Sequence, residues 1–162
     1  MKCSNCGNDC PDGTLYCAKC GNKVADYCYL LDRFDPINIE EMFRKFNLQT
    51  ENYFFVMTNV ATYKYLIAGS LANFSRQYAV INFNVNEIVM FMFSRLDNKK
   101  VTNIIRLSRN EILKTKVSNH LISYNLSIET NNGNFHFQLF KKYGKFDKQK
   151  DSINKFQQMF PN

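Results

Sequence analysis

The 162-residue sequence predicts an α+β protein in which a small cysteine-built module precedes a mostly antiparallel rolled sheet or barrel. Three observations carry this prediction. Two CxxC pairs lie within the first twenty residues. From Gln77 to Leu139, apolar and polar residues alternate with the period of two that is typical of strands. Apolar residues then recur at helical spacing near 148–160, which predicts a C-terminal helix that caps the sheet.

The two cysteine pairs, Cys3–Cys6 and Cys17–Cys20, predict a structural metal site. Each pair is followed by glycine, and ten residues separate the pairs. Two residues between paired cysteines let both sulfurs meet one ion, and four thiolates at about 2.3 Å make a closed tetrahedral zinc site. Glycine accepts the positive φ that turns backbone N–H groups toward the sulfurs. So short a segment cannot fold on its own core, so one structural Zn²⁺ would supply its folding free energy. The predicted ligands are Cys3, Cys6, Cys17 and Cys20.

The six cysteines leave two alternatives to zinc, a disulfide framework or another thiolate-binding metal such as iron. Met1 leads into the first pair without a secretory signal, so we expect a cytoplasmic protein with reduced cysteines. A ligand role for Cys10 would break the CxxC pairing. We therefore interpret Cys10 and Cys28 as bystanders.

Residues 1–24, MKCSNCGNDCPDGTLYCAKCGNKV, resemble the short zinc-ribbon modules found at the N-termini of many bacterial proteins. Pro11 and Gly13 supply the turn of that pattern, Tyr16 its aromatic residue and Val24 its aliphatic one. The resemblance covers about one-seventh of the chain. It implies zinc, in modules that are mostly structural or protein-contacting and that only sometimes touch nucleic acid.

The remaining residues are numerous enough for one hydrophobic core, and the predicted domains are 1–25 for the ribbon, 26–35 for a linker and 36–162 for an α+β domain. Asn38 and Glu41 have the spacing of a capping box and predict the start of the first helix. Hydrophobic periodicity predicts helices at 39–47, 60–74 and 148–160, an apolar run of undetermined type at 53–57, and strands at 77–83, 87–94, 101–107, 111–118, 122–129 and 135–139. Asn132-Gly133 is a strong hairpin signal before the last strand.

The segment from about Tyr53 to Phe160 resembles the pleckstrin-homology-like (PH-like) domains of uncharacterised Gram-positive bacterial proteins. The matching stretches are NVATYKYLIAGSL, QYAVINFNVNEIVMFMFSRLDNKKVTNIIRLSRNEI and LSIETNNGNFHFQLFKK. The resemblance implies a rolled sheet with a C-terminal helix and, by itself, no ligand. Residues 84–87, expected between the first two strands, carry no Lys or Arg, unlike the corresponding loop of phosphoinositide-binding members.

Positive charge is concentrated in residues 99–150, which contain eleven basic and three acidic residues, while the whole chain has a net charge of +7. Such a bias attracts nucleic acid, anionic lipid or an acidic protein, and the alternative interpretation is a solubilising polar face. Arginine, the usual reader of bases and phosphates, is scarce in this stretch. The candidate anion- or partner-binding residues are Lys99, Lys100, Lys141, Lys142 and Lys145.

The sequence contains no HExxH, GxSxG, P-loop or GxGxxG pattern, and four cysteine ligands would leave zinc no open position for water. We therefore predict a non-enzymatic, zinc-containing binding or scaffold module that contacts a protein partner. The alternative is nucleic-acid binding through the ribbon and the basic face of residues 99–150. Association with an anionic membrane surface ranks third, and no small-molecule substrate is evident.

Overall fold

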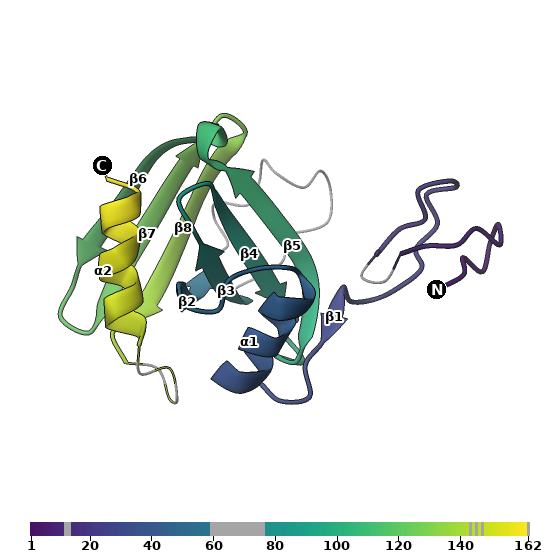
Figure 1. Ribbon diagram of the computed structural model, residues 1–162, viewed down its shortest axis with the longest axis horizontal. Helices are drawn as coiled ribbons and strands as arrows, with labels where there is room; N and C mark the ends of the chain where they lie inside the picture. The colour runs from purple at the N-terminus through teal and green to yellow at the C-terminus, as the bar shows by residue number, and fades with distance from the viewer. Residues whose placement is uncertain (12–13, 59–76, 143, 145, 147, 162) are drawn as a thin grey trace.

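The structure is a computed structural model that describes residues 1–11, 14–58, 77–142, 144, 146 and 148–161 (Figure 1). Its elements, in chain order, are β1 (Tyr29–Leu30), α1 (Pro36–Lys45), β2 (Tyr53–Thr58), β3 (Gln77–Phe83), β4 (Glu87–Phe93), β5 (Lys100–Ser108), the 3-10 helix η2 (Arg109–Glu111), β6 (Ile112–Asn119), β7 (Ser123–Thr130), β8 (Gly133–Phe140) and α2 (Gln149–Met159).

These elements confirm the predicted α+β class. Each of the six predicted strands is present as β3 to β8, and the run at 53–57, whose type the sequence left undetermined, is strand β2. The helices predicted near 39–47 and 148–160 are α1 and α2. The helix predicted at 60–74 lies outside the described residues. Among the described helices, none is long and apolar enough to cross a membrane.

The eight strands form one antiparallel sheet in the order β1-β5-β4-β3-β2-β8-β7-β6. The sheet is not closed into a barrel, because β1 and β6 end the order as separate edges. The last hairpin turns one residue earlier than its Asn-Gly signal suggested. Thr130 pairs with Gly133, so Asn131 and Asn132 form the turn and Gly133 begins β8.

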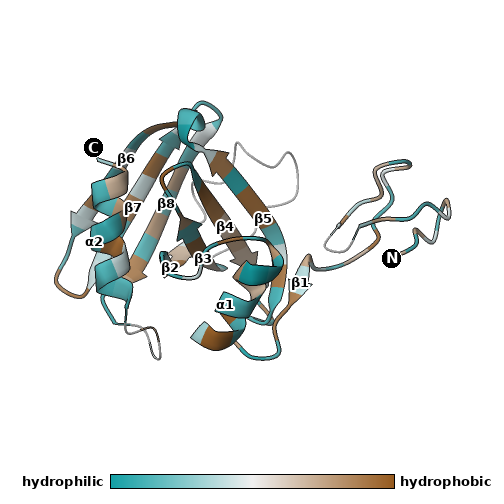
Figure 2. Cartoon of the chain, in the orientation of Figure 1, coloured by the Kyte–Doolittle hydropathy of each residue, from teal (hydrophilic) through white to brown (hydrophobic). Residues whose placement is uncertain are grey.

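Hydrophobic residues pack on both faces of the central strands. In β3, Ala79, Ile81 and Phe83 join a cluster that also contains inward-facing residues of β7, β8 and α2. Val80, between them, joins a second cluster with residues of α1. Figure 2 shows β4 as brown along most of its length, in keeping with a strand that is buried from both sides. The two clusters place the core on either side of β2, β3 and β4.

The C-terminal helix α2 packs against the first of these clusters. Phe156 is fully buried, with its ring 5.4 Å from that of Phe54 and 5.2 Å from that of Phe83 between centroids. Ile153 and Phe160 are buried beside it. The predicted packing of this helix through Ile153, Phe156 and Phe160 is therefore confirmed.

Gln149, the first residue of α2, completes the sheet where β2 and β8 separate. Among the described residues, β2 and β8 pair at two positions, Met57 with Gln138 and Thr58 with Phe137. Beyond them, the buried amide of Gln149 accepts a hydrogen bond from the Phe55 N–H at 3.0 Å. It donates to the Phe55 carbonyl and to the Phe140 carbonyl, each at 2.9 Å. The Gln149 side chain therefore takes the place of direct backbone hydrogen bonds between β2 and β8.

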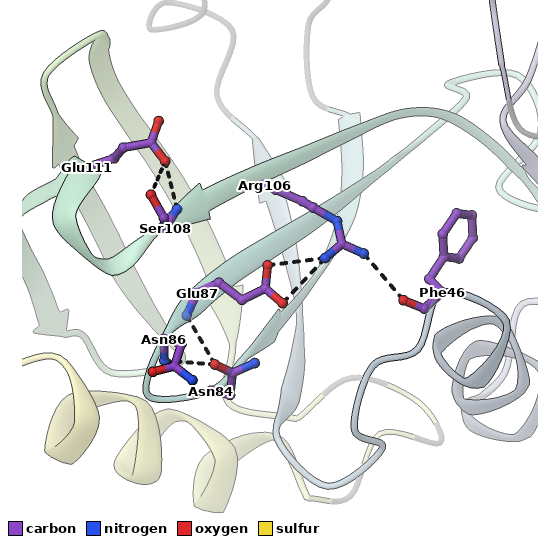
Figure 3. Close-up of polar contacts among 7 residues, drawn as sticks. All are labelled: Phe46, Asn84, Asn86, Glu87, Arg106, Ser108 and Glu111. Carbon is purple, nitrogen blue, oxygen red and sulfur yellow. Dashed lines mark hydrogen bonds and ion pairs between the residues drawn. The ribbon is translucent and has the colours of Figure 1, made fainter.

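A polar cluster holds the β3–β4 turn against β5 (Figure 3). The Asn84 side chain accepts hydrogen bonds from the N–H groups of Asn86 and Glu87. Arg106 of β5 binds the Glu87 carboxylate at 3.2 Å and donates to the Phe46 carbonyl at 3.3 Å. The sequence predicted that residues 84–87 join the first two strands. Because β2 precedes β3, this turn instead joins the second and third long strands of the sheet. The connection between the first two is residues 59–76, outside the described residues.

The range predicted as a linker, 26–35, contributes an edge strand to the sheet. Tyr29 and Leu30 of β1 pair with Val101 and Lys100 of β5. Leu31, directly after β1, is buried in the second core cluster. The residues before β1 therefore connect the cysteine pairs directly to the sheet edge, while the domain boundaries remain a prediction.

Asp35, rather than Asn38, caps the N-terminus of α1. Its carboxylate accepts hydrogen bonds from the side chain and backbone N–H of Asn38 at 2.8 and 3.0 Å. Pro36 follows at the first helical position, which it favours because it has no N–H to satisfy. The helix therefore begins before the predicted capping box. The hydrogen bonds from Asn38, together with the nearby Arg33 guanidinium, lower the pKa of Asp35 to about 2.

We expect the Asp35 carboxylate to make stability depend on pH below about 4. Because its folded pKa lies below the unfolded value of about 3.9, its contribution is complete above that value and is lost as the pH falls toward about 2. Urea unfolding of the wild type and of Asp35→Asn should give a difference in unfolding free energy that shrinks between about pH 4 and pH 2. A difference that is constant over this interval would contradict the assignment.

Candidate metal centre

The two cysteine pairs fold into matching turns. Gly7 donates its N–H to the Cys3 carbonyl at 2.9 Å, and Gly21 donates to the Cys17 carbonyl at 2.8 Å. The φ angles of the two glycines are 69° and 70°. A Cβ built at either position would meet nothing within 4 Å. Glycine is therefore required for its backbone conformation, not for the space that it leaves.

A short antiparallel bridge closes each turn and makes the two halves near copies. Cys3 donates its N–H to the Asn8 carbonyl at 2.9 Å, and Cys17 donates to the Asn22 carbonyl at 2.8 Å. The bridges themselves pair Lys2 with Asp9 and Tyr16 with Lys23. We call these two units the cysteine knuckles, residues 2–9 and 16–23.

The four predicted ligand sulfurs converge between the knuckles. Their Sγ atoms all lie within 4.8 Å of one another. Two of these separations cross from one knuckle to the other, 3.7 Å between Cys3 and Cys20 and 3.6 Å between Cys6 and Cys17. Tetrahedral metal–sulfur bonds of about 2.3 Å require sulfurs about 3.8 Å apart. The donor set and its spacing therefore fit one metal ion held by all four cysteines.

Backbone N–H groups favour the thiolate at part of this site. Hydrogen bonds from the N–H groups of Cys20 and Lys19 lower the pKa of Cys17 to about 6. At Cys6 the Asn8 N–H also lowers the pKa, but hydrogen bonds shared with the neighbouring thiols, together with burial, raise it to about 12. A divalent cation between the sulfurs would favour the thiolate at every position. Metal binding would therefore release protons and weaken as the pH falls.

Cys10 and Cys28 lie outside the four-cysteine group. Cys10 is buried against Cys3 and Cys17, its thiol donates to the Asn8 carbonyl at 3.7 Å, and burial raises its pKa. Cys28 is half-buried beside the second core cluster, and desolvation raises its pKa. Cys10 therefore packs next to the candidate metal centre without being one of its members.

The lysines predicted to bind an anion or partner come from the two ends of the β5-to-β8 part of the sheet order, and their role remains a prediction. Lys100 pairs with Asp97 at 3.8 Å, and neighbouring Lys99 is exposed at the same turn. Lys141 lies over the Tyr124 ring at 5.3 Å, and Lys142 is exposed after β8. Strands β4, β3 and β2 separate β5 from β8 in the sheet. Lys145 lies outside the described residues.

We expect reversal of Lys141 and Lys142 to glutamate to leave the fold intact. Exposed charges contribute about 0–1 kcal/mol to stability, and the Lys141–Tyr124 contact adds on the order of 0.5–1 kcal/mol. Urea unfolding of Lys141→Glu/Lys142→Glu should therefore stay within about 2 kcal/mol of the wild type. Capture of a native partner by the same variant would test the binding role, which remains a prediction. Capture equal to the wild type would leave these lysines with a solubility role.

The sequence did not predict a recess on the surface of the sheet. A recess of about 350 Å³ lies over β6, β7 and β8, lined by Lys116, Ser118, Asn125, Leu126, Ser127, His136 and Phe137. The polar members alternate with core residues along each strand. The alternation was visible in the sequence, but the alignment of the three strands that gathers these side chains was not.

Comparison of the chain with protein-family models, curated proteins and solved structures finds no match. The comparisons therefore identify no family and no homologue. The cysteine group and the antiparallel sheet are features of the structure alone.

Proposed function

We propose that the chain is a non-enzymatic binding or scaffold module in which one structural Zn²⁺ builds the N-terminal residues into a ribbon that contacts a protein partner. The observation that carries this proposal is the convergence of four cysteine sulfurs from two knuckles at nearly tetrahedral spacing. A zinc ion with four thiolates has no open position for water, which supports a structural role. Thiolates also suit iron, so elemental analysis decides between the two metals.

The surroundings of the ribbon support contact with a protein. Figure 1 shows the N-terminal residues extending away from the sheet beyond β1, so much of their surface is free of the core. Tyr16 is 59% exposed on the second knuckle, and Tyr27 is exposed just before β1. Tyrosine is enriched at protein interfaces because it offers a large apolar ring and a hydroxyl. A cytoplasmic location would keep the four thiols reduced and available for metal.

The alternative is binding of nucleic acid through the ribbon and the basic face of residues 99–150. The excess of eleven basic over three acidic residues favours it. Binding of this kind weakens steeply as salt rises, because counterions released from the phosphates must be recaptured. Titration of the zinc-loaded protein with labelled DNA and RNA at two salt concentrations tests this alternative directly.

Affinity capture from native cells tests the proposed function. The zinc-loaded full chain should retain a specific protein, and Cys3→Ser/Cys17→Ser should lose it by at least about tenfold. Cys28→Ser is the matched control, because Cys28 lies outside the four-cysteine group. Equal capture by the double variant would exclude the ribbon as the contact. Loss of capture after nuclease treatment would instead support the nucleic-acid alternative.

A further inference from the structure

Strand β6 (Ile112–Asn119) is an edge of the sheet that pairs with β7 on one side. His120 donates its N–H to the Ser123 carbonyl at 2.8 Å, which fixes the hairpin register. Because hydrogen-bonded and non-hydrogen-bonded pairs alternate in an antiparallel ladder, the N–H and C=O groups of Thr115, Val117 and Asn119 point away from β7. In the part of the chain that the structure describes, no strand pairs with that side.

The opposite edge of the sheet is partly covered. Strand β1 pairs with the beginning of β5 through Tyr29 and Leu30. Farther along β5, Arg106 donates to the Phe46 carbonyl and so holds the end of α1 beside the strand (Figure 3). In Figure 1, β6 runs along the outer margin of the sheet, well apart from α1 and β1. Among the described residues, the longest run of outward backbone groups without a pairing strand therefore belongs to β6. The Thr115 side chain, which alternates toward the core, donates to the Phe160 carbonyl at the end of α2 at 2.6 Å.

The solvent face beside this edge carries two lysines, one glutamate and several hydrogen-bonding groups, with the exposed Glu129 of β7 opposite Lys114. Lys114 and Lys116 are exposed on β6. The register places Lys116 opposite Ser127, and Ser127 opposite His136, so a lysine, a hydroxyl and an imidazole form one row across three strands. The recess of about 350 Å³ includes this row. Such a surface suits a carboxylate, which a cation and neutral donors can bind together.

A second copy of the chain fits this edge poorly. Antiparallel pairing of β6 with another β6 would bring Lys114 and Lys116 close to the same lysines of the partner. Like charges across a strand pair are destabilising, and lysine on an edge strand commonly prevents this kind of self-association. A strand with acidic residues at alternate positions has the complementary charge. The two lysines therefore disfavour pairing with a second copy of β6 and favour pairing with an acidic strand.

We propose that β6 binds an extended acidic segment of a partner protein by strand addition. The segment would exchange backbone hydrogen bonds with Thr115, Val117 and Asn119. Its carboxylates would face Lys114 and Lys116, with one of them reaching the recess. Backbone hydrogen bonds give affinity in this mode, and alternate side chains give specificity. The inference rests on the proposed binding function for the nature of the partner, but uses a surface on the sheet instead of the ribbon.

A pair of peptides tests the charge requirement. The probes have eight residues, the length of β6, and alternate glutamate or lysine with valine and threonine. The zinc-loaded full chain should bind the glutamate peptide at least about tenfold more tightly than the lysine peptide. Lys114→Glu/Lys116→Glu should reverse the preference, an outcome that a purely structural role for these lysines would not produce. Lys150→Glu, exposed on α2, is the matched charge control and should bind as the wild type does.

Amide hydrogen exchange tests the geometry. The glutamate peptide should slow exchange at Thr115, Val117 and Asn119 by at least about tenfold. Exchange at Lys116 and Ser118 should change little, since these N–H groups already face β7. Val117→Pro should abolish binding while retaining the fold, because an edge strand tolerates proline where the N–H faces solvent. If that variant unfolds, the exchange pattern of the wild type and the charge-reversed variant still test whether the peptide adds to β6.

The proposal is overturned if the glutamate peptide does not bind, if it binds without protecting β6, or if the reversed variant keeps its preference for glutamate. If single-stranded DNA or phosphatidylserine vesicles slow amide exchange in β6 and the peptide does not, the proposal of a protein partner is likewise overturned. Cys3→Ser/Cys17→Ser should still bind the peptide, because the knuckles do not contribute to the β6 edge. Failure at β6 is therefore distinguishable from failure of the ribbon.

Discussion

Replacement of Cys3 and Cys17 by serine should remove the bound metal and unfold residues 1–24 while the sheet remains folded. The two residues come from different knuckles, so each loses a ligand and neither can hold the ion alone. Structural zinc sites of this class have apparent binding free energies of about 10–16 kcal/mol, which is the folding free energy of the segment. The sheet has two hydrophobic clusters of its own and does not depend on the ion.

Elemental analysis and amide exchange measure this result. The wild type and Cys28→Ser should each carry one zinc per chain, and the double variant none. Exchange should become fast in residues 1–24 of the double variant and remain slow in β3 and β4. Iron in place of zinc would correct the metal while keeping the site. Retention of zinc by the double variant, or its absence from the wild type, would refute the site itself.

The second large effect is expected from Phe156→Ala. The ring of Phe156 is fully buried against Phe54, Phe83 and Phe160. Its removal leaves a cavity between α2 and the sheet and should lower the unfolding free energy by about 3–5 kcal/mol. Urea unfolding of the full chain, followed by circular dichroism, measures the change. Because the cluster lies in the sheet and not in the knuckles, the zinc content should be unchanged.

Gln157→Ala is the matched control on the same helix. Gln157 is exposed, and substitutions at such positions change stability by within about 0.5 kcal/mol. A loss of less than about 1 kcal/mol for Phe156→Ala would show that α2 contributes little to the core in solution. A similar loss in both variants would mean that burial of the Phe156 ring does not determine the effect, since alanine favours the helix at both positions.

The cysteine group was predictable because its determinants are local. Each knuckle is specified by two cysteines and the glycine that follows them, so the spacing within a few residues fixes the turn. The strands from β5 to β8 were predictable for a similar reason, since the period of two is a property of each strand. Strands β3 and β4, buried on both faces, were recognisable as apolar runs of strand length on either side of a polar turn. Strand β2 gave no such signal. Its residues YFFVMT face a hydrophobic cluster on both sides, which removes the alternation.

Features that depend on strand order were not predictable in this way. The insertion of β2 between β3 and β8 is one such feature, and nothing in the local sequence indicates it. The predicted mostly antiparallel sheet is present, but the same order leaves it open, so the closed barrel among the predicted forms is not made. At the start of α1, the prediction failed locally: Asn38 and Glu41 matched a capping pattern, but Asp35 and Pro36 provide a stronger one three residues earlier.

The bridge made by Gln149 has a consequence for the order in which the protein folds during synthesis. The sheet consists of a β1–β5 group and a β6–β8 group, which meet where β2 adjoins β8. Gln149 satisfies the backbone groups of Phe55 and Phe140 at that seam. Gln149 follows every strand in the chain and is synthesised after all of them. A chain that ends before residue 149 would lack this bridge, so we expect proteases to cleave it at the seam faster than they cleave the full chain.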